Sequence, residues 1–128
     1  MNVQGWLDAY KKAWEERDPA AAAALFTEDS KYFEQPYEAP FQGSEGVRDY
    51  WIRVTETQSD IDLRWGRPVS EGDRTAVEWW CRFKNEGAPV TLAGSMTLLF
   101  ADDGRCRELR EYWHFAPEHA APQEGWGE

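Results

Sequence analysis

A glutamate interrupts an apolar pattern near the end of the chain. Over residues 107–115, alternation places Glu111 on the same strand face as Leu109 and Trp113. Burying an ionised carboxylate is costly unless it is paired, so such a group usually has a raised pKa or a partner. The pattern therefore predicts either an acid–base group in a pocket or a structural ion pair, for which Arg67 is the candidate partner.

A second carboxylate lies in a short strand expected at residues 30–36. Glu34 shares one face of that strand with Tyr32, and alternation alone does not decide whether this face is buried. Among apolar neighbours Glu34 could serve as a general base. The alternative is a solvated carboxylate, or a partner of Arg48 or Arg53.

Motifs for other chemistries do not occur in the sequence. HExxH, GxxxxGK[ST], GxGxxG, GxSxG and CxxC are all missing. Glu111 and His114 point to opposite faces of their strand, and His119 lies near the end of the chain, so we expect no metal site and no catalytic histidine. Cys81 has no histidine close to it in sequence and is expected to be inert core. We therefore expect no cofactor.

The first half of the chain is expected to be mainly helical. Over residues 3–17 the apolar side chains, Tyr10 and Trp14 among them, recur with helical spacing and form one stripe. Asp18 and Pro19 suit the cap and the first turn of a second helix, which an alanine run continues.

A third helix is expected after the short strand. Residues 27–29 break the helical pattern before that strand, and residues 37–43 contain Pro40 and Gly43, which are typical of a loop. Ser44 is then positioned to cap the helix that follows.

From residue 60 the hydrophobic period changes from 3.6 to 2. Turn residues divide this part into four expected strands, at residues 60–70, 74–86, 89–101 and 105–115. Helices followed by an antiparallel meander predict an α+β fold with the helices on one face of the sheet. Residues 116–128 are rich in Pro, Gly, Ala and Glu and are expected to form a mobile C-terminal tail rather than a segment docked through Trp126.

The second face of the late strands also carries large side chains, including Trp80 and Tyr112. An antiparallel sheet with aromatic residues on its outer face often buries that face against another subunit. We therefore predict a homodimer through this face.

Composition narrows the class of protein further. The chain has 128 residues, enough for one domain, with 41% hydrophobic and 30% charged residues. A net charge of −10 disfavours binding to nucleic acid and to anionic membranes. No long apolar run, leader segment or disulfide framework is apparent, so the expected compartment is the cytoplasm.

Four segments carry a family resemblance: Tyr10-(x)7-Asp18-Pro19, Ala24 to Asp29, Gly43 to Val47, and Gly104-(x)4-Leu109 to Trp113. Over residues 5–115 the chain resembles the nuclear transport factor 2-like superfamily, in particular its SnoaL-like polyketide cyclase and ketosteroid isomerase branch. The resemblance implies a cystatin-like, cone-shaped antiparallel sheet, curved and wrapped around N-terminal helices, in a single domain at residues 1–115. It also implies a ligand pocket in the mouth of the cone, and dimers are common in the family.

The resemblance implies roles for particular residues. Ketosteroid isomerases hold an enolate oxygen with a tyrosine of the first helix and a protonated aspartic acid on a late strand, and a carboxylate on the first short strand is the base. Aligned without gaps, these positions fall on Tyr10, Met96 and Glu34. Met96 cannot donate a proton, which argues against steroid isomerisation. Glu111, on the same inward face one strand along, is the expected replacement.

We therefore predict a protein that binds a small apolar or aromatic molecule. If catalytic, it is a cofactor-independent isomerase, cyclase or dehydratase for an apolar cyclic carbonyl compound, with Glu34 as base and with Tyr10 and Glu111 holding the oxygen. The expected pocket lining is Trp14, Trp51, Trp65, Trp79, Met96, Leu98 and Trp113. Two alternatives remain: a non-catalytic ligand-binding protein with ion-paired carboxylates, and a dimeric association module whose interior is filled by its own side chains.

Overall fold

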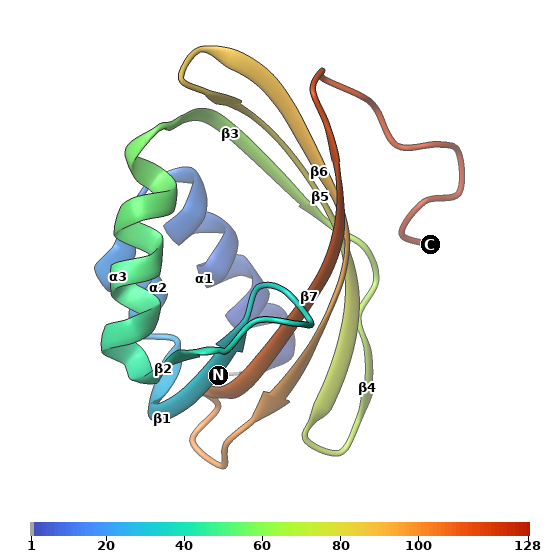
Figure 1. Cartoon of the computed structure of the whole chain (residues 1–128). Coiled ribbons are helices and arrows are strands. Elements are labelled where there is room, and N and C mark those ends of the chain that lie inside the picture. The colour runs from blue at the N-terminus through green and yellow to red at the C-terminus, as the bar shows by residue number, and fades with distance from the viewer. Residues whose placement is uncertain (1) are drawn as a thin grey trace.

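Three helices pack against the concave face of a curved, open sheet in the computed structural model, which describes residues 2–128 (Figure 1). This arrangement confirms the predicted α+β fold. The elements are α1 (Val3–Glu15), α2 (Pro19–Ala23), β1 (Phe26–Phe33), β2 (Phe41–Gln42), α3 (Gly43–Glu56), β3 (Gln58–Trp65), β4 (Val69–Glu71), β5 (Arg74–Asn85), β6 (Ala88–Phe100) and β7 (Cys106–Ala116). No helix among the described residues has the length and apolar character needed to cross a membrane.

The strand order is β2-β1-β7-β6-β5-β3, and the short strand β4 pairs with β5. Strands β3, β5, β6 and β7 pair antiparallel with one another, as the alternating pattern predicts, but the single strand expected at residues 60–70 is divided into β3 and β4. The exception is β1, which pairs with β7 in parallel. This pairing places a strand from the first third of the chain beside the last strand, β7.

The expected strand at residues 30–36 is shifted in the structure. Strand β1 covers Phe26–Phe33, so it begins one residue before the segment expected to be a break and ends just before Glu34. Strand β1 pairs with β7, which lies far away in the sequence, and with β2, which lies in the segment expected to be a loop. Local propensity does not register partners of this kind.

The start of the third helix also differs from the prediction. Ser44 does not cap it; α3 begins at Gly43, and its N-cap residue Gln42 makes no side-chain cap bond. Gly43 has φ of +74°, and a Cβ there would lie 2.8 Å from the carbonyl oxygen of Glu28. A close approach to β1 therefore sets this boundary. The cap of α2 agrees with the prediction, because the Asp18 carboxylate accepts from Ala21 N at 3.1 Å.

Aromatic side chains fill the space between the helices and the sheet. Trp6 and Tyr10 of α1 stack with ring centroids 5.1 Å apart, and Trp14 packs against both Trp51 of α3 and Trp79 of β5. All five side chains are buried. The interior of the cone is thus occupied by the protein's own side chains.

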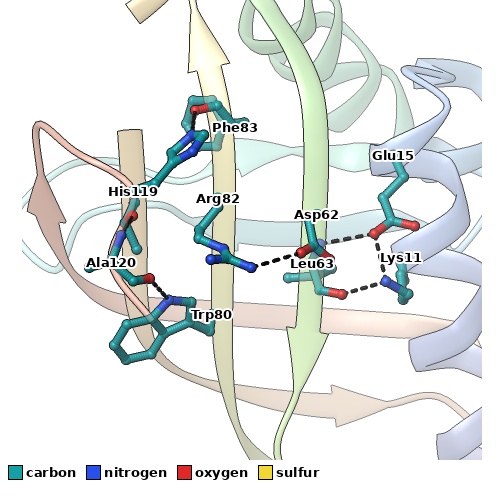
Figure 2. A network of polar contacts seen from close by, with 10 residues as sticks. Lys11, Glu15, Asp62, Leu63, Trp80, Arg82, Phe83, His119 and Ala120 are labelled. Carbon is teal, nitrogen blue, oxygen red and sulfur yellow. Dashed lines mark hydrogen bonds and ion pairs between the residues drawn. The ribbon is translucent and has the colours of Figure 1, made fainter. Parts of the chain in front are cut away.

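Polar contacts at the edge of the sheet fix α1 in place (Figure 2). Lys11 donates to the carbonyl oxygen of Leu63 at 2.5 Å, and the Glu15 carboxylate accepts from Leu63 N at 2.9 Å. Lys11 and Glu15 are themselves paired at 2.6 Å. These bonds hold α1 beside β3 and so help to set the depth of Tyr10 in the core.

The C-terminal segment lies along the convex face of the sheet (Figure 1). The Trp80 indole donates to the carbonyl oxygen of Ala120 at 2.9 Å, and Thr91 exchanges hydrogen bonds with the backbone of residues 118 and 120. Trp126 packs against Trp80 with ring centroids 5.8 Å apart. The expectation of a mobile end was therefore wrong. Local composition did not reveal that Trp80 and Thr91 offer partners.

Candidate active site

A buried chain of three polar side chains crosses the core. The phenolic oxygens of Tyr10 and Tyr32 lie 3.1 Å apart, and the Tyr32 hydroxyl donates to Oε1 of Glu111 at 2.5 Å. These residues come from α1, β1 and β7. Only 6% of Glu111 is exposed, and the two tyrosines are buried completely or almost so. The structure thus joins two predicted site residues, Tyr10 and Glu111, through a third.

The parallel pairing of β1 with β7 brings this chain together. Tyr32 is the register partner of Leu109, and Glu111 follows two residues later on the same face. On the other side of β7, Glu111 is the partner of Met96 in β6. Glu111 therefore lies one strand away from Met96 on the inner face, as the sequence pattern indicates.

The direction of the hydrogen bonds follows from the number of protons. Tyr32 has one hydroxyl proton and uses it toward Glu111. Its oxygen can then only accept from Tyr10, so the chain runs from Tyr10 through Tyr32 to Glu111. The hydroxyl proton of Tyr10 is consequently donated to Tyr32 and not to a ligand. Tyr10 acts through Tyr32 on the carboxyl group.

Burial raises the pKa of Glu111 to about 8. The charge on Glu34 adds to this increase, while hydrogen bonding from Tyr32 and Trp113 opposes it. Desolvation prevails, and none of the ion pairs between residues 2–128 includes Glu111; its partner is a tyrosine hydroxyl and not the suggested Arg67. At neutral pH Glu111 is therefore mainly a neutral carboxylic acid, able to donate a proton or a hydrogen bond.

The neighbouring tyrosines stay protonated for the same reason. Burial, and next the charge of Glu111, raise the pKa of Tyr10 and Tyr32 well above the ordinary value. The pKa of Tyr50 on α3 is raised by burial first and then by the charges of Glu111 and Glu34. All three remain neutral hydroxyl groups across the physiological range.

A pocket of about 660 Å³ borders the Glu111 end of this hydrogen-bond chain. It lies beyond the end of β1, where β7 continues past its last pairing with β1 at Arg110. Glu34, which is half-buried in the loop after β1, lies at its rim. The lining residues are Glu34, Gln35, Pro36, Glu78, Trp80, Ala93, Gly94, Ser95, Glu111, Tyr112, Trp113, His114 and Trp126. Two of the three predicted catalytic residues, Glu34 and Glu111, thus border one pocket.

Of the seven residues predicted to line the pocket, Trp113 does so. The structure places five others in the packed core: Trp14, Trp51, Trp79, Met96 and Leu98. Trp65 is partly buried against that core, and its indole donates to the carbonyl oxygen of Leu7 at 2.9 Å. The inward direction of these side chains agrees with alternation, but neighbours fill the space that a deeper pocket would need.

Sequence reasoning gave no role to Tyr32 and placed His114 away from the pocket. The available signal for Tyr32 was its position two residues before Glu34, in a Tyr-x-Glu pattern. His114 does face outward, yet the pocket extends to the convex face and includes it. The position of Tyr32 depends on the pairing of β1 with β7, and that of His114 on the pairing of β6 with β7.

The cysteines are buried, and burial raises the pKa of the Cys106 thiol to about 12 and that of Cys81 well above its usual value. Neither is therefore an activated nucleophile. Within residues 2–128 no group of three or more His, Cys, Asp or Glu side chains is arranged to hold a metal ion.

The family model for the SnoaL-like domain matches residues 6–109, and the chain belongs to this family. No curated protein sequence is significantly similar to it. Solved structures with the same fold include a hypothetical protein with a ketosteroid isomerase-like fold from Catenulispora acidiphila, in complex with trimethylamine. It has a TM-score of 0.77 and 18% identity over 87% of this chain and 86% of that chain.

Two further structures are similar over the same share of the chain. One is SalBIII, an epoxide hydrolase/cyclase-like enzyme in pyran ring formation in polyether salinomycin, with a TM-score of 0.76 and 16% identity over 87% of this chain and 89% of that chain. The other is a SnoaL-like polyketide cyclase candidate from Shewanella denitrificans, with a TM-score of 0.75 and the same identity and coverage. At these identities the similarity establishes the fold.

Proposed function

We propose that this SnoaL-like protein is a cofactor-independent acid–base enzyme that acts on a small, apolar, cyclic carbonyl compound. The observation that carries the proposal is the buried hydrogen-bond chain ending on Glu111. It supplies a neutral carboxylic acid next to a pocket whose rim holds a second carboxylate, Glu34. Two carboxyl groups in such different surroundings are suited to opposite roles, one as acid and one as base.

In the proposed reaction the Glu34 carboxylate removes a proton from the carbon next to the carbonyl group. The electron pair moves onto the carbonyl oxygen, and the acid form of Glu111 donates a hydrogen bond to the enolate. Glu34 then returns the proton, to the same carbon or to another one, which gives exchange or isomerisation. Tyr32 and Tyr10 are positioning residues, because they orient the Glu111 carboxyl group.

The comparisons support a reaction of this kind without naming a substrate. One similar structure is an epoxide hydrolase/cyclase-like enzyme in pyran ring formation, and another is described as a SnoaL-like polyketide cyclase. Ring closure and isomerisation both need one group that takes a proton and another that stabilises oxygen. Cyclisation and dehydration of a cyclic carbonyl compound therefore belong to the same proposal.

A second candidate function is binding without chemistry. Binding of this kind is confined to the surface, because Trp51, Trp79 and Met96 fill the interior, which is the feature expected above of the association module. In that case Glu111 is a structural acid held by Tyr32, and ligands contact only the outer pocket. The two candidates differ in what they expect of solvent exchange at the α-carbon of a ligand.

The test uses a panel of cyclic ketones and β,γ-unsaturated cyclic enones in D2O, with loss of the α-proton followed by ¹H NMR. We expect exchange above the rate without enzyme for at least one member. Glu34→Gln should reduce it by about 100-fold or more, in the range typical of a positioned general base. Glu111→Gln should also reduce it.

Glu38→Gln is the matched control, because Glu38 is an exposed carboxylate in the same loop and is not among the pocket-lining residues. The Glu38→Gln variant should catalyse exchange of the α-proton at the wild-type rate. Exchange that is equally fast in Glu34→Gln contradicts the assignment of the base. No exchange of any panel member contradicts the proposed chemistry and favours binding alone.

A further inference from the structure

A trough runs along strand β6 on the convex face of the sheet. Two small outward residues, Ala93 and Ser95, form its floor. In the register of the sheet each has a larger neighbour on both sides: Trp80 and His114 flank Ala93, and Glu78 and Tyr112 flank Ser95. All six line the pocket described above. Small residues between large ones give a depression with aromatic and acidic walls.

The C-terminal segment adds a further wall. The ring of Trp126 meets that of Trp80 at an interplanar angle of 76°, so the two indoles form a corner. Backbone pairing keeps this wall in place, because Arg67 N donates to the carbonyl oxygen of Gly127 at 2.8 Å. The Trp80 indole is itself held by Ala120, as Figure 2 shows. The protein's own hydrogen bonds therefore hold the two indole rings in this arrangement.

The charge around the trough favours cations. Glu78 and Glu34 are among the lining residues, and the lining drawn from residues 2–128 includes no lysine or arginine. Glu78 takes part in none of the ion pairs between described residues. The whole chain carries a net charge of −10. A concave surface with carboxylates of one sign raises the local concentration of the opposite charge.

We propose that this trough binds a small organic cation with an alkylated ammonium group, seated against the faces of Trp80 and Trp126. The negative faces of indole rings attract a cation, and the apolar ring surface suits methyl groups better than it suits a hydrated metal ion. The Glu78 carboxylate supplies the counter-charge. The trough is the convex-face part of the pocket that Glu34 and Glu111 also border, and the contacts proposed for the cation do not require the chemistry assigned to those two residues.

The test is titration with tetramethylammonium chloride, followed by calorimetry and by the ¹H–¹⁵N signals of the indole groups. Sodium chloride at equal concentration controls for ionic strength, and tert-butanol is a neutral probe of similar shape. We expect saturable shifts with tetramethylammonium alone. Trp126→Ala should weaken binding about tenfold and Glu78→Gln about threefold, as cation–π and partly exposed charge contacts allow.

Two variants keep this test sharp. Trp126→Phe retains an aromatic face, so this variant should bind tetramethylammonium within about threefold of the wild type. If substitution of Trp126 instead detached the C-terminal segment from the sheet, Trp126→Ala and Trp126→Phe would weaken binding equally. Glu71→Gln removes an exposed carboxylate of β4 that is not among the lining residues and should change nothing. Shifts that sodium chloride or tert-butanol reproduces, or an affinity unchanged in both Trp126→Ala and Glu78→Gln, overturn the proposal.

Discussion

The hydroxyl of Tyr32 lies 2.5 Å from Oε1 of Glu111, although the two residues are 79 positions apart in the sequence. The bond links β1, the first strand in the sequence, to β7, the last one. Removal of either partner therefore changes both the stability of the fold and the acidity of the site.

Stability should fall as pH rises through the titration of Glu111. Its pKa is raised to about 8 in the folded protein, while an ordinary glutamic acid has a value of 4.5. The folded state binds the proton more tightly, so this contribution is fully present below about pH 4.5 and is lost as pH rises to about 8. Glu111→Gln removes the titration. Urea unfolding at several pH values should therefore show the wild type losing stability relative to the variant, by at most about 1.4 kcal/mol per pH unit in that range. A difference that does not change with pH contradicts this.

Tyr32→Phe should destabilise the protein by about 1–3 kcal/mol, because it leaves the buried Glu111 without its hydroxyl partner. It should also raise the pKa of Glu111 further, since the hydrogen bond from Tyr32 lowers it. Thermal unfolding and a carboxyl ¹³C NMR titration measure the two effects. Tyr37→Phe is the control, because Tyr37 is 99% exposed, and it should change stability by less than about 0.5 kcal/mol. Equal effects of the two substitutions would argue against a structural role for the bond.

Glu34→Gln should lower the pKa of Glu111, because the charge on Glu34 is one cause of its increase. The same ¹³C titration reports this change without any substrate. Glu38→Gln, in the same loop, should leave the Glu111 signal where it is. If Glu34→Gln has no effect, the two carboxyl groups are not coupled, and their joint action in one pocket loses its support.

Gly94→Ala should cost at least about 3 kcal/mol of stability. A Cβ at this position would lie 1.9 Å from the carbonyl oxygen of Tyr112 and 2.6 Å from Cα of Trp113. Both are backbone atoms of the paired strand, so β6 and β7 would have to separate beside the pocket. Ser95→Ala, one residue along, should be nearly neutral. Chemical denaturation measures the free energy of unfolding of both variants. A Gly94→Ala protein as stable as the wild type contradicts the close approach of β6 and β7.

The homodimer through the convex face remains a prediction, and the structure changes where it can form. The C-terminal segment covers the Trp80 end, whereas Val69 at the other end is 72% exposed. Val69 pairs with Ala76, which is the partner of Thr97, so these side chains share the outer face. Val69→Arg should turn the dimer into a monomer in light scattering. Ile52→Arg, on the exposed surface of α3, should not. A wild-type monomer at every concentration contradicts the prediction.

Local pattern alone was sufficient for much of the fold. The helical stripe that buries Tyr10, the Asp18 cap, the four late strands and their inward faces all follow from periodicity and turn residues in short segments. Glu111 could be singled out in the same way, because a carboxylate between Leu109 and Trp113 conflicts with the apolar face around it. These features depend on residues close together in the chain.

Tertiary structure decided the features that depend on distant pairing. The sequence does not state that β1 runs parallel to β7, and this pairing alone brings Tyr32 to Glu111 and ends the strand before Glu34. Whether inward aromatic residues enclose a cavity or fill it depends on how the side chains of α1, α3 and the sheet pack together. The docking of residues 117–128 on the convex face likewise depends on donors and acceptors in β5 and β6. Propensity is a property of neighbours in sequence, whereas burial and acidity are set by neighbours in space.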